Sequence, residues 1–134
     1  LREKTKAAGI ELVLLTTPTT PQERMGLISK AADGFVYLVS DTGVTGMRTK
    51  VADRVQGLLG MLREETDKPV AVGFGISGPE QAKQVSAWGA DGVIVGSAIV
   101  RTLESAEKPE DGVAAVGELA ASIKKAANEE RVAA

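Results

Sequence analysis

The chain contains no cysteine and no histidine. Without cysteine it can form no disulfide, no thiolate nucleophile and no cysteine-ligated metal site. Without histidine it lacks the commonest general base, the Ser-His triad and the usual ligand of zinc sites. A basic surplus is missing too, because 16 Lys and Arg face 18 Asp and Glu, for a formal net charge of -2. We therefore expect no nucleic-acid partner and no anionic membrane surface as a partner.

Long apolar runs are also absent. No stretch approaches the roughly 20 residues that span a bilayer, and no signal peptide is recognisable at the start. The chain opens on Leu1, so we expect a processed chain or a piece of a longer one. Its 134 residues and 43% apolar composition suit one domain with a real core. We predict a single region over 1–134.

Short apolar runs alternate with helical patterns along the chain. The runs lack polar alternation, which is typical of strands covered on both faces in a parallel sheet. With right-handed crossovers, this order predicts a parallel α/β fold. The predicted strands are 12–17, 35–40, 70–74 and 92–96. The predicted helices are 1–8, 21–32, 51–62, 79–88, 99–103 and 113–123, with a polar break over 107–112 before the last.

One helix start carries a specific capping signal. Thr20-Pro21-Gln22-Glu23 is interpreted as a capping box, with Pro21 at the first helical position.

Glycine turns follow the last two predicted strands and precede helices. They are Gly73-Phe74-Gly75 and Gly96-Ser97. In βα folds, ligands bind beyond the carboxyl ends of the strands. Glycine lets a backbone N–H approach an anion closely, and a helix N-terminus adds positive potential. Either turn alone could simply be a tight connection, but the pair favours a phosphate site.

The other residues expected on this face allow more than one interpretation. The segment Gly43 to Arg48 could be a mobile lid or a plain connection. Tyr37 could face the pocket or fill the sheet, and Phe74 could stack on a flat apolar substrate. Asp41 is the one carboxylate here. General acid–base chemistry needs a positioned group of suitable pKa, so this face offers a binding half without a convincing catalytic half.

Two acidic residues precede strands and belong to the opposite face. Glu11 and Asp91 are expected to be solvated or capping groups there, because the amino-terminal face of such folds serves stability.

Five segments together resemble the α subunit of tryptophan synthase, in the plant and cyanobacterial branch that includes the plant indole-3-glycerol-phosphate lyases. The segments are Leu14–Thr19, Phe35–Ser40, Gly43–Gly46, Gly73–Ser77 and Gly92–Ala98. The resemblance implies a C-terminal half, strands five to eight, of a (β/α)8 TIM barrel of the ribulose-phosphate-binding type. The chain would hold the last four βα units plus the closing helix.

The resemblance also implies an activity and a set of site residues. The family cleaves indole-3-glycerol phosphate to indole and glyceraldehyde 3-phosphate, a retro-aldol lyase step of tryptophan biosynthesis. Gly46, Gly75, Gly96 and Ser97 match its phosphate ligands. Phe74 matches an indole-pocket wall, Tyr37 the active-site tyrosine and Thr45 the lid threonine.

The family's acid/base glutamate and its indole-binding aspartate follow strands two and three, and neither has a counterpart in this chain. Asp41 stands where some members carry a basic residue, which puts the lid contacts in question. The chain alone is therefore expected to be inactive. No metal or organic cofactor is implied, since pyridoxal phosphate belongs to the β subunit, the expected partner in an αββα complex.

Two alternative functions and the cellular compartment stay open. The chain could belong to a free-standing indole-3-glycerol-phosphate lyase or be a non-catalytic phosphate-binding half-barrel. The cytoplasm is the expected compartment, or the plastid stroma in a plant or alga. An open half-barrel would have two unpaired edges and an uncovered inner face, so we expect the isolated chain to dimerise, aggregate or be poorly stable.

Overall fold

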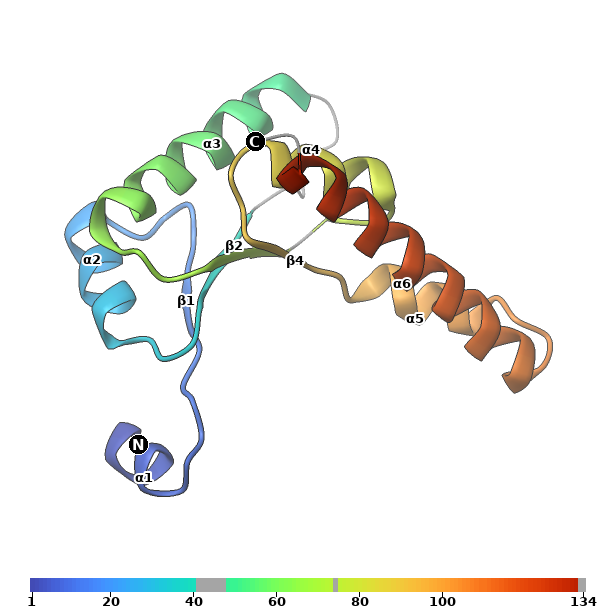
Figure 1. Cartoon of the computed structure of the whole chain (residues 1–134), viewed down its shortest axis with the longest axis horizontal. Coiled ribbons are helices and arrows are strands. Elements are labelled where there is room, and N and C mark those ends of the chain that lie inside the picture. The colour runs from blue at the N-terminus through green and yellow to red at the C-terminus, as the bar shows by residue number, and fades with distance from the viewer. Residues whose placement is uncertain (41–47, 74, 133–134) are drawn as a thin grey trace.

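A computed structural model describes residues 1–40, 48–73 and 75–132. Four parallel strands form one sheet in the order β1-β2-β3-β4 (Figure 1). They are β1 (Leu14–Thr16), β2 (Val36–Val39), β3 (Val70–Gly73) and β4 (Gly92–Ile94). The predicted parallel α/β fold is confirmed, with each strand next to its predecessor in sequence.

Helices connect the strands and close the chain. They are α1 (Arg2–Ala7), α2 (Gln22–Ala31), α3 (Arg48–Glu65), α4 (Pro79–Ala87), α5 (Ser97–Glu104) and α6 (Pro109–Val132). The closing helix is longer than predicted, because it begins inside the expected polar break and continues to Val132, beyond the predicted end at 123. Pro109 suits a first helical position, and Glu110 and Asp111 in the first turn favour the helix dipole. None of the helices in the described ranges is long and apolar enough to cross a membrane.

The predicted capping box at α2 is wrong. Pro21, rather than Thr20, is the N-cap residue, and no side chain caps this end. The Thr20 hydroxyl instead accepts a hydrogen bond from the Thr17 amide at 3.0 Å. That hydroxyl therefore closes the turn after β1, and the helix begins one residue later than the sequence pattern suggests.

The core lies on one face of the sheet. Val36, Leu38, Val70 and Val72 point to this outer face and are fully buried. They pack against apolar side chains of α2, α3 and α4, which Figure 1 shows on the same side of the sheet. The helical residues of this cluster include Met25, Val55, Leu58, Leu59, Leu62, Ala82 and Val85.

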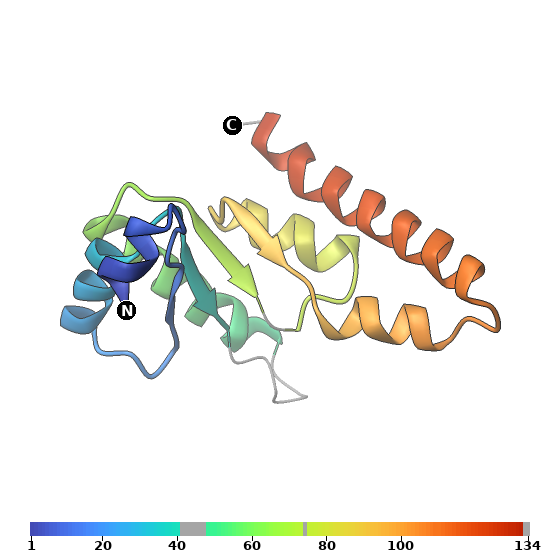
Figure 2. The same cartoon turned by 90° about the horizontal axis from the view of Figure 1, so that it is seen from below.

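Among the described residues, no helix covers the opposite, inner face of the sheet in this way. The strand registers put Leu15, Tyr37 and Ala71 side by side on it. Leu15 is 51% exposed, whereas its neighbour Thr16, which points into the core, is 0% exposed. Figure 2, seen from below, shows the arrows of β2, β3 and β4 broadside, with α6 running alongside α4. The uncovered inner face predicted for a half-barrel is therefore present.

The amino-terminal rim of the sheet contains a motif that the sequence analysis missed. Asp33 and Asp91 each follow a helix, precede a glycine and exchange two hydrogen bonds with the start of the preceding strand. The Asp33 carboxylate accepts from the Leu12 amide at 3.3 Å, and the Asp91 carboxylate accepts from the Val70 amide at 2.7 Å. The backbone N–H of each aspartate donates back to the same residue's carbonyl. The expected structural role of Asp91 is thus confirmed, while Glu11 is exposed.

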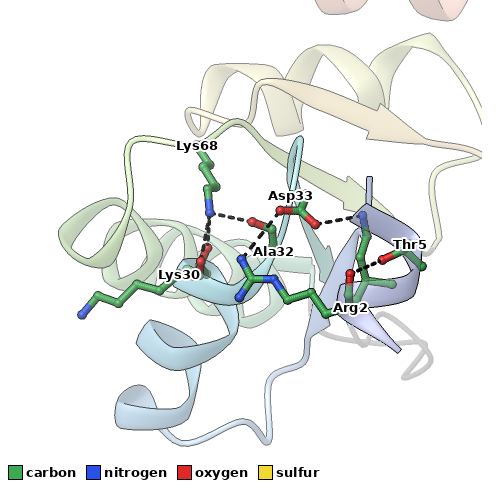
Figure 3. A network of polar contacts seen from close by, with 8 residues as sticks. Arg2, Thr5, Lys30, Ala32, Asp33 and Lys68 are labelled. Atoms are coloured by element: carbon green, nitrogen blue, oxygen red, sulfur yellow. Dashed lines mark hydrogen bonds and ion pairs between the residues drawn. The ribbon is translucent and has the colours of Figure 1, made fainter. Parts of the chain in front are cut away.

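A lysine caps the C-terminal end of α2 at this rim (Figure 3). The Lys68 ammonium donates to the carbonyl oxygens of Ser29 at 2.8 Å and Ala32 at 2.6 Å, with a longer bond to Lys30 at 3.3 Å. A cation at a helix C-terminus satisfies orphan carbonyls and opposes the negative end of the dipole. Lys68 precedes β3, so this contact joins α2 to the middle of the sheet.

We expect Lys68→Met to lower the free energy of unfolding by about 1–2 kcal/mol, because charge-assisted bonds to the helix end are lost. Lys30→Met is the control. Lys30 makes an exposed ion pair with Glu65 at 3.8 Å, and its loss should cost under about 0.5 kcal/mol. Urea denaturation followed by circular dichroism measures both. Equal losses in the two variants would contradict this role of Lys68.

Candidate functional site

Parallel pairing brings the two predicted glycine turns to the same rim of the sheet. Gly73 in β3 pairs with Ile94 in β4. Gly75 and Gly96 each lie two residues beyond this pair, at the carboxyl ends of neighbouring strands. Gly75 has a φ of 73°, a left-handed conformation that favours glycine. Both glycines therefore lie at one rim, Gly75 in a left-handed conformation and Gly96 at the start of α5.

The start of α5 provides donors at this rim. Gly96 is its N-cap residue and Ser97 its first residue, and no side-chain hydrogen bond caps this end. The first amides of a helix have no partner within the helix and favour an anion. A Cβ added at Gly96 would meet nothing within 4 Å, so packing does not require glycine there. Gly75, Gly96 and Ser97 are all exposed, so a ligand could reach them.

Tyr37 lies on the inner face and reaches toward the same rim. Its backbone pairs with Ala71, yet its ring lies over Gly73, which is two residues nearer the carboxyl end of β3. A Cβ added at Gly73 would lie 2.5 Å from both Cε2 and Oη of Tyr37. Gly73 therefore leaves the space that the ring occupies, and the two residues form one unit of the site. The sequence pattern indicates Tyr37 as a site residue but predicts only a turn role for Gly73.

Ser40 is a further residue at this rim that sequence analysis left without a role. Its backbone N–H donates to the Gly73 carbonyl at 2.9 Å, and its hydroxyl donates to the same oxygen at 3.3 Å. Ser40 is buried. These bonds extend the β2–β3 pairing past the last strand residues and hold the backbone on which Tyr37 and Gly73 meet. A small hydroxyl residue directly after an apolar strand was the available signal.

Four of the predicted residues, Asp41, Thr45, Gly46 and Phe74, lie outside the described residues. The lid and the indole-pocket wall therefore stay predictions. No acidic residue directly follows any strand within the described part of the chain, where the rim carries Thr17, Ser40, Gly75 and Gly96. The described residues also hold no cluster of three or more acidic side chains that could bind a metal ion. Among the described residues, this rim therefore presents backbone amides and hydroxyl groups.

Comparisons with known proteins point to one family. The family model described as tryptophan synthase alpha chain matches residues 1–128. The tryptophan synthase alpha chain of Arabidopsis thaliana is 57% identical over 126 residues, which are 94% of this chain and 46% of the relative. That of Trichodesmium erythraeum is 54% identical over 128 residues, 96% of this chain and 48% of the relative. The chain spans about half the length of the curated relatives it matches.

Solved structures agree. Tryptophan synthase subunit alpha from Legionella pneumophila superposes with a TM-score of 0.77 at 31% identity, covering 96% of this chain and 46% of that one. Such neighbours are TIM barrels, so the four-stranded sheet is half of a barrel, as predicted.

The close approach of Gly73 and Tyr37 can be tested by substitution. We expect Gly73→Ala to displace the Tyr37 ring, because the new methyl would overlap it. Tyr37 is the only tyrosine, so its ring signals in an NMR spectrum are unambiguous. Gly92→Ala is the matched control on the same face, where the added Cβ would meet Ala71 at an ordinary 3.7 Å. Unchanged Tyr37 signals in Gly73→Ala would refute the contact.

Proposed function

The chain belongs to the tryptophan synthase alpha chain family, and on that basis we propose that it forms the substrate-phosphate and indole-binding half of a lyase that cleaves indole-3-glycerol phosphate. The products are indole and glyceraldehyde 3-phosphate, in the biosynthesis of tryptophan. The family membership supplies the reaction, and the rim of the sheet supplies the physical support for the assigned half.

One observation carries the proposal: Gly75 and Gly96 follow neighbouring, in-register strands. Their turns can direct backbone amides at a single anion, and the uncapped start of α5 adds the Ser97 amide and a positive dipole end. A phosphate group held by these backbone amides does not need a lysine side chain. The remaining phosphate ligand in this proposal is Gly46, from the segment after β2.

The same rim accommodates the rest of the substrate. Tyr37 lies on the inner face, with its ring over Gly73. It is beside the proposed phosphate cradle, which is formed by the backbone amides of Gly75, Gly96 and Ser97. We assign it, with Phe74, to the walls around the indole ring, since aromatic side chains bury flat apolar surface well. Thr45 belongs to the lid that closes on this pocket. In this proposal Tyr37 and Thr45 assist the reaction without transferring a proton, and this segment provides no catalytic acid or base.

Proton transfer falls to the other half of the barrel. Cleavage requires a proton to arrive at indole C3 while the adjacent glycerol hydroxyl loses one, so that the C–C bond breaks and the hydroxyl carbon becomes an aldehyde. Both transfers need positioned groups of suitable pKa. The chain covers less than half of the curated relatives' length, and the half it covers has binding residues at its rim. We therefore assign the glutamate and the aspartate to the other half.

The β subunit of tryptophan synthase is the proposed partner of the complete α chain. A free-standing lyase would share the substrate and the site but would gain nothing from a β subunit. Activity of the complete protein with and without that subunit separates the two possibilities.

Inorganic phosphate should bind at the cradle. Titration followed by NMR is expected to shift the amide signals of Gly75, Gly96 and Ser97. Gly96→Asp should weaken binding about ten-fold or more, because aspartate is a good N-cap whose carboxylate engages the same amides and repels the anion. Gly117→Asp is the control, with the same charge change at an exposed glycine of α6 that has open space around it. Equal affinities in both variants would contradict the cradle.

The chain alone should release no indole from indole-3-glycerol phosphate above the buffer rate, because the proton-transfer groups are missing. The complete alpha chain of Arabidopsis thaliana is the positive control. Phosphate binding without turnover supports a binding half. Turnover at a rate comparable to the control would show that this half contains its own acid and base.

A further inference from the structure

We propose that Ser40 is a positioning residue for phosphate binding, because its buried hydroxyl fixes the end of β3 from which the turn at Gly75 departs. This inference rests on the proposed function, since it concerns the same phosphate cradle. Ser40 does not touch the phosphate in this proposal. It acts through the carbonyl oxygen of Gly73, two residues before the cradle amide of Gly75.

Ser40 is a hydroxyl residue at a position where the strand pattern favours an apolar side chain. Along β2, buried and half-buried residues alternate, and the buried ones, Val36 and Leu38, belong to the core. Ser40 continues this alternation and is only 2% exposed. Burying a hydroxyl costs free energy unless it forms a hydrogen bond, so an apolar side chain would serve the core better. The partner of this hydroxyl therefore indicates the role of the serine.

That partner is a carbonyl oxygen that already has a backbone donor. The Gly73 carbonyl accepts from the Ser40 backbone N–H at 2.9 Å and from the Ser40 hydroxyl at 3.3 Å. Any residue except proline could provide the backbone bond, which continues the parallel pairing of β2 with β3. The hydroxyl bond requires a side chain such as serine. Two donors at one oxygen restrict the rotation of the peptide group to which that oxygen belongs.

The turn at Gly75 lies between two buried residues. Gly73 is buried at the end of β3, and Ile76 is 5% exposed within the core cluster. Gly75 itself is exposed and left-handed, one residue before Ile76. With so short a segment between the two buried residues, the orientation of the Gly73 carbonyl sets the direction of the Gly75 amide. Backbone amides bind an anion well only when they are held in the productive direction, so Ser40 controls the phosphate affinity of the cradle.

Ser40→Ala in the complete protein tests the proposal. Titration with inorganic phosphate, followed by the NMR amide signals of Gly75 and Gly96, gives the dissociation constant. We expect this constant to rise about three- to ten-fold, the effect of losing one hydrogen bond of ordinary strength. The midpoint of urea denaturation should change little, because the Gly73 carbonyl keeps its backbone donor.

Ser29→Ala is the matched control. Ser29 is also a buried serine, 0% exposed, and its hydroxyl donates to one backbone carbonyl, that of Met25 within α2, at 2.8 Å. Its loss removes the same kind of bond away from the carboxyl rim and should leave the phosphate dissociation constant unchanged. Steady-state kinetics with indole-3-glycerol phosphate provide a second readout. Ser40→Ala should raise KM by a larger factor than it lowers kcat, because it disturbs a binding group and not a proton-transfer group.

The possible failures of this inference and of the proposed function can be distinguished. If the unsubstituted protein binds phosphate at Gly75 and Gly96 and Ser40→Ala binds it equally well, the role of Ser40 is overturned and the cradle stands. An equal loss of affinity in Ser29→Ala would also overturn that role, because the effect would then follow from removing any buried hydroxyl. If phosphate shifts neither glycine signal in the unsubstituted protein, the cradle itself is overturned, and the inference with it.

Discussion

The in-register parallel pairing of β3 with β4 is the constraint on which the site depends. It sets Gly73 beside Ile94, and the two residues that follow each of them carry the chain into glycine turns at one rim. A change of register by one residue would turn every side chain of a strand to the other face and separate the turns. The buried valines on the outer face oppose such a slip, because it would turn Val70 and Val72 out of the core.

The two rims of the sheet differ in what their polar residues do. At the amino-terminal rim, Asp33 and Asp91 bind the starts of preceding strands, and Lys68 closes the end of α2. These side chains form hydrogen bonds with the backbone of the fold. At the carboxyl rim, the helix start at Gly96 has no side-chain cap, and Gly75, Gly96 and Ser97 are exposed. Polar residues that stabilise the fold thus lie at one end of the strands and the proposed ligand-binding residues lie at the other, as is usual in βα folds.

The sequence predicted most of the fold, because strands buried on both faces and amphipathic helices leave strong periodic patterns. It also predicted that Gly75 and Gly96 would share a rim, since consecutive parallel strands end together. Local signals that compete with tertiary contacts were less reliable. Thr20 looked like a cap but closes the preceding turn, and the polar run before Val113 looked like a break but starts α6. The contacts of Lys68 with α2 and of Tyr37 with Gly73 join residues more than thirty positions apart, and no local pattern reports them.

A crystal structure of the chain grown with glycerol 3-phosphate tests the central claim most directly. We predict one phosphate group whose oxygens lie about 2.8–3.2 Å from the amide nitrogens of both Gly75 and the start of α5. A phosphate bound elsewhere, or amides of Gly75 and Ser97 that point to separate partners, would contradict it.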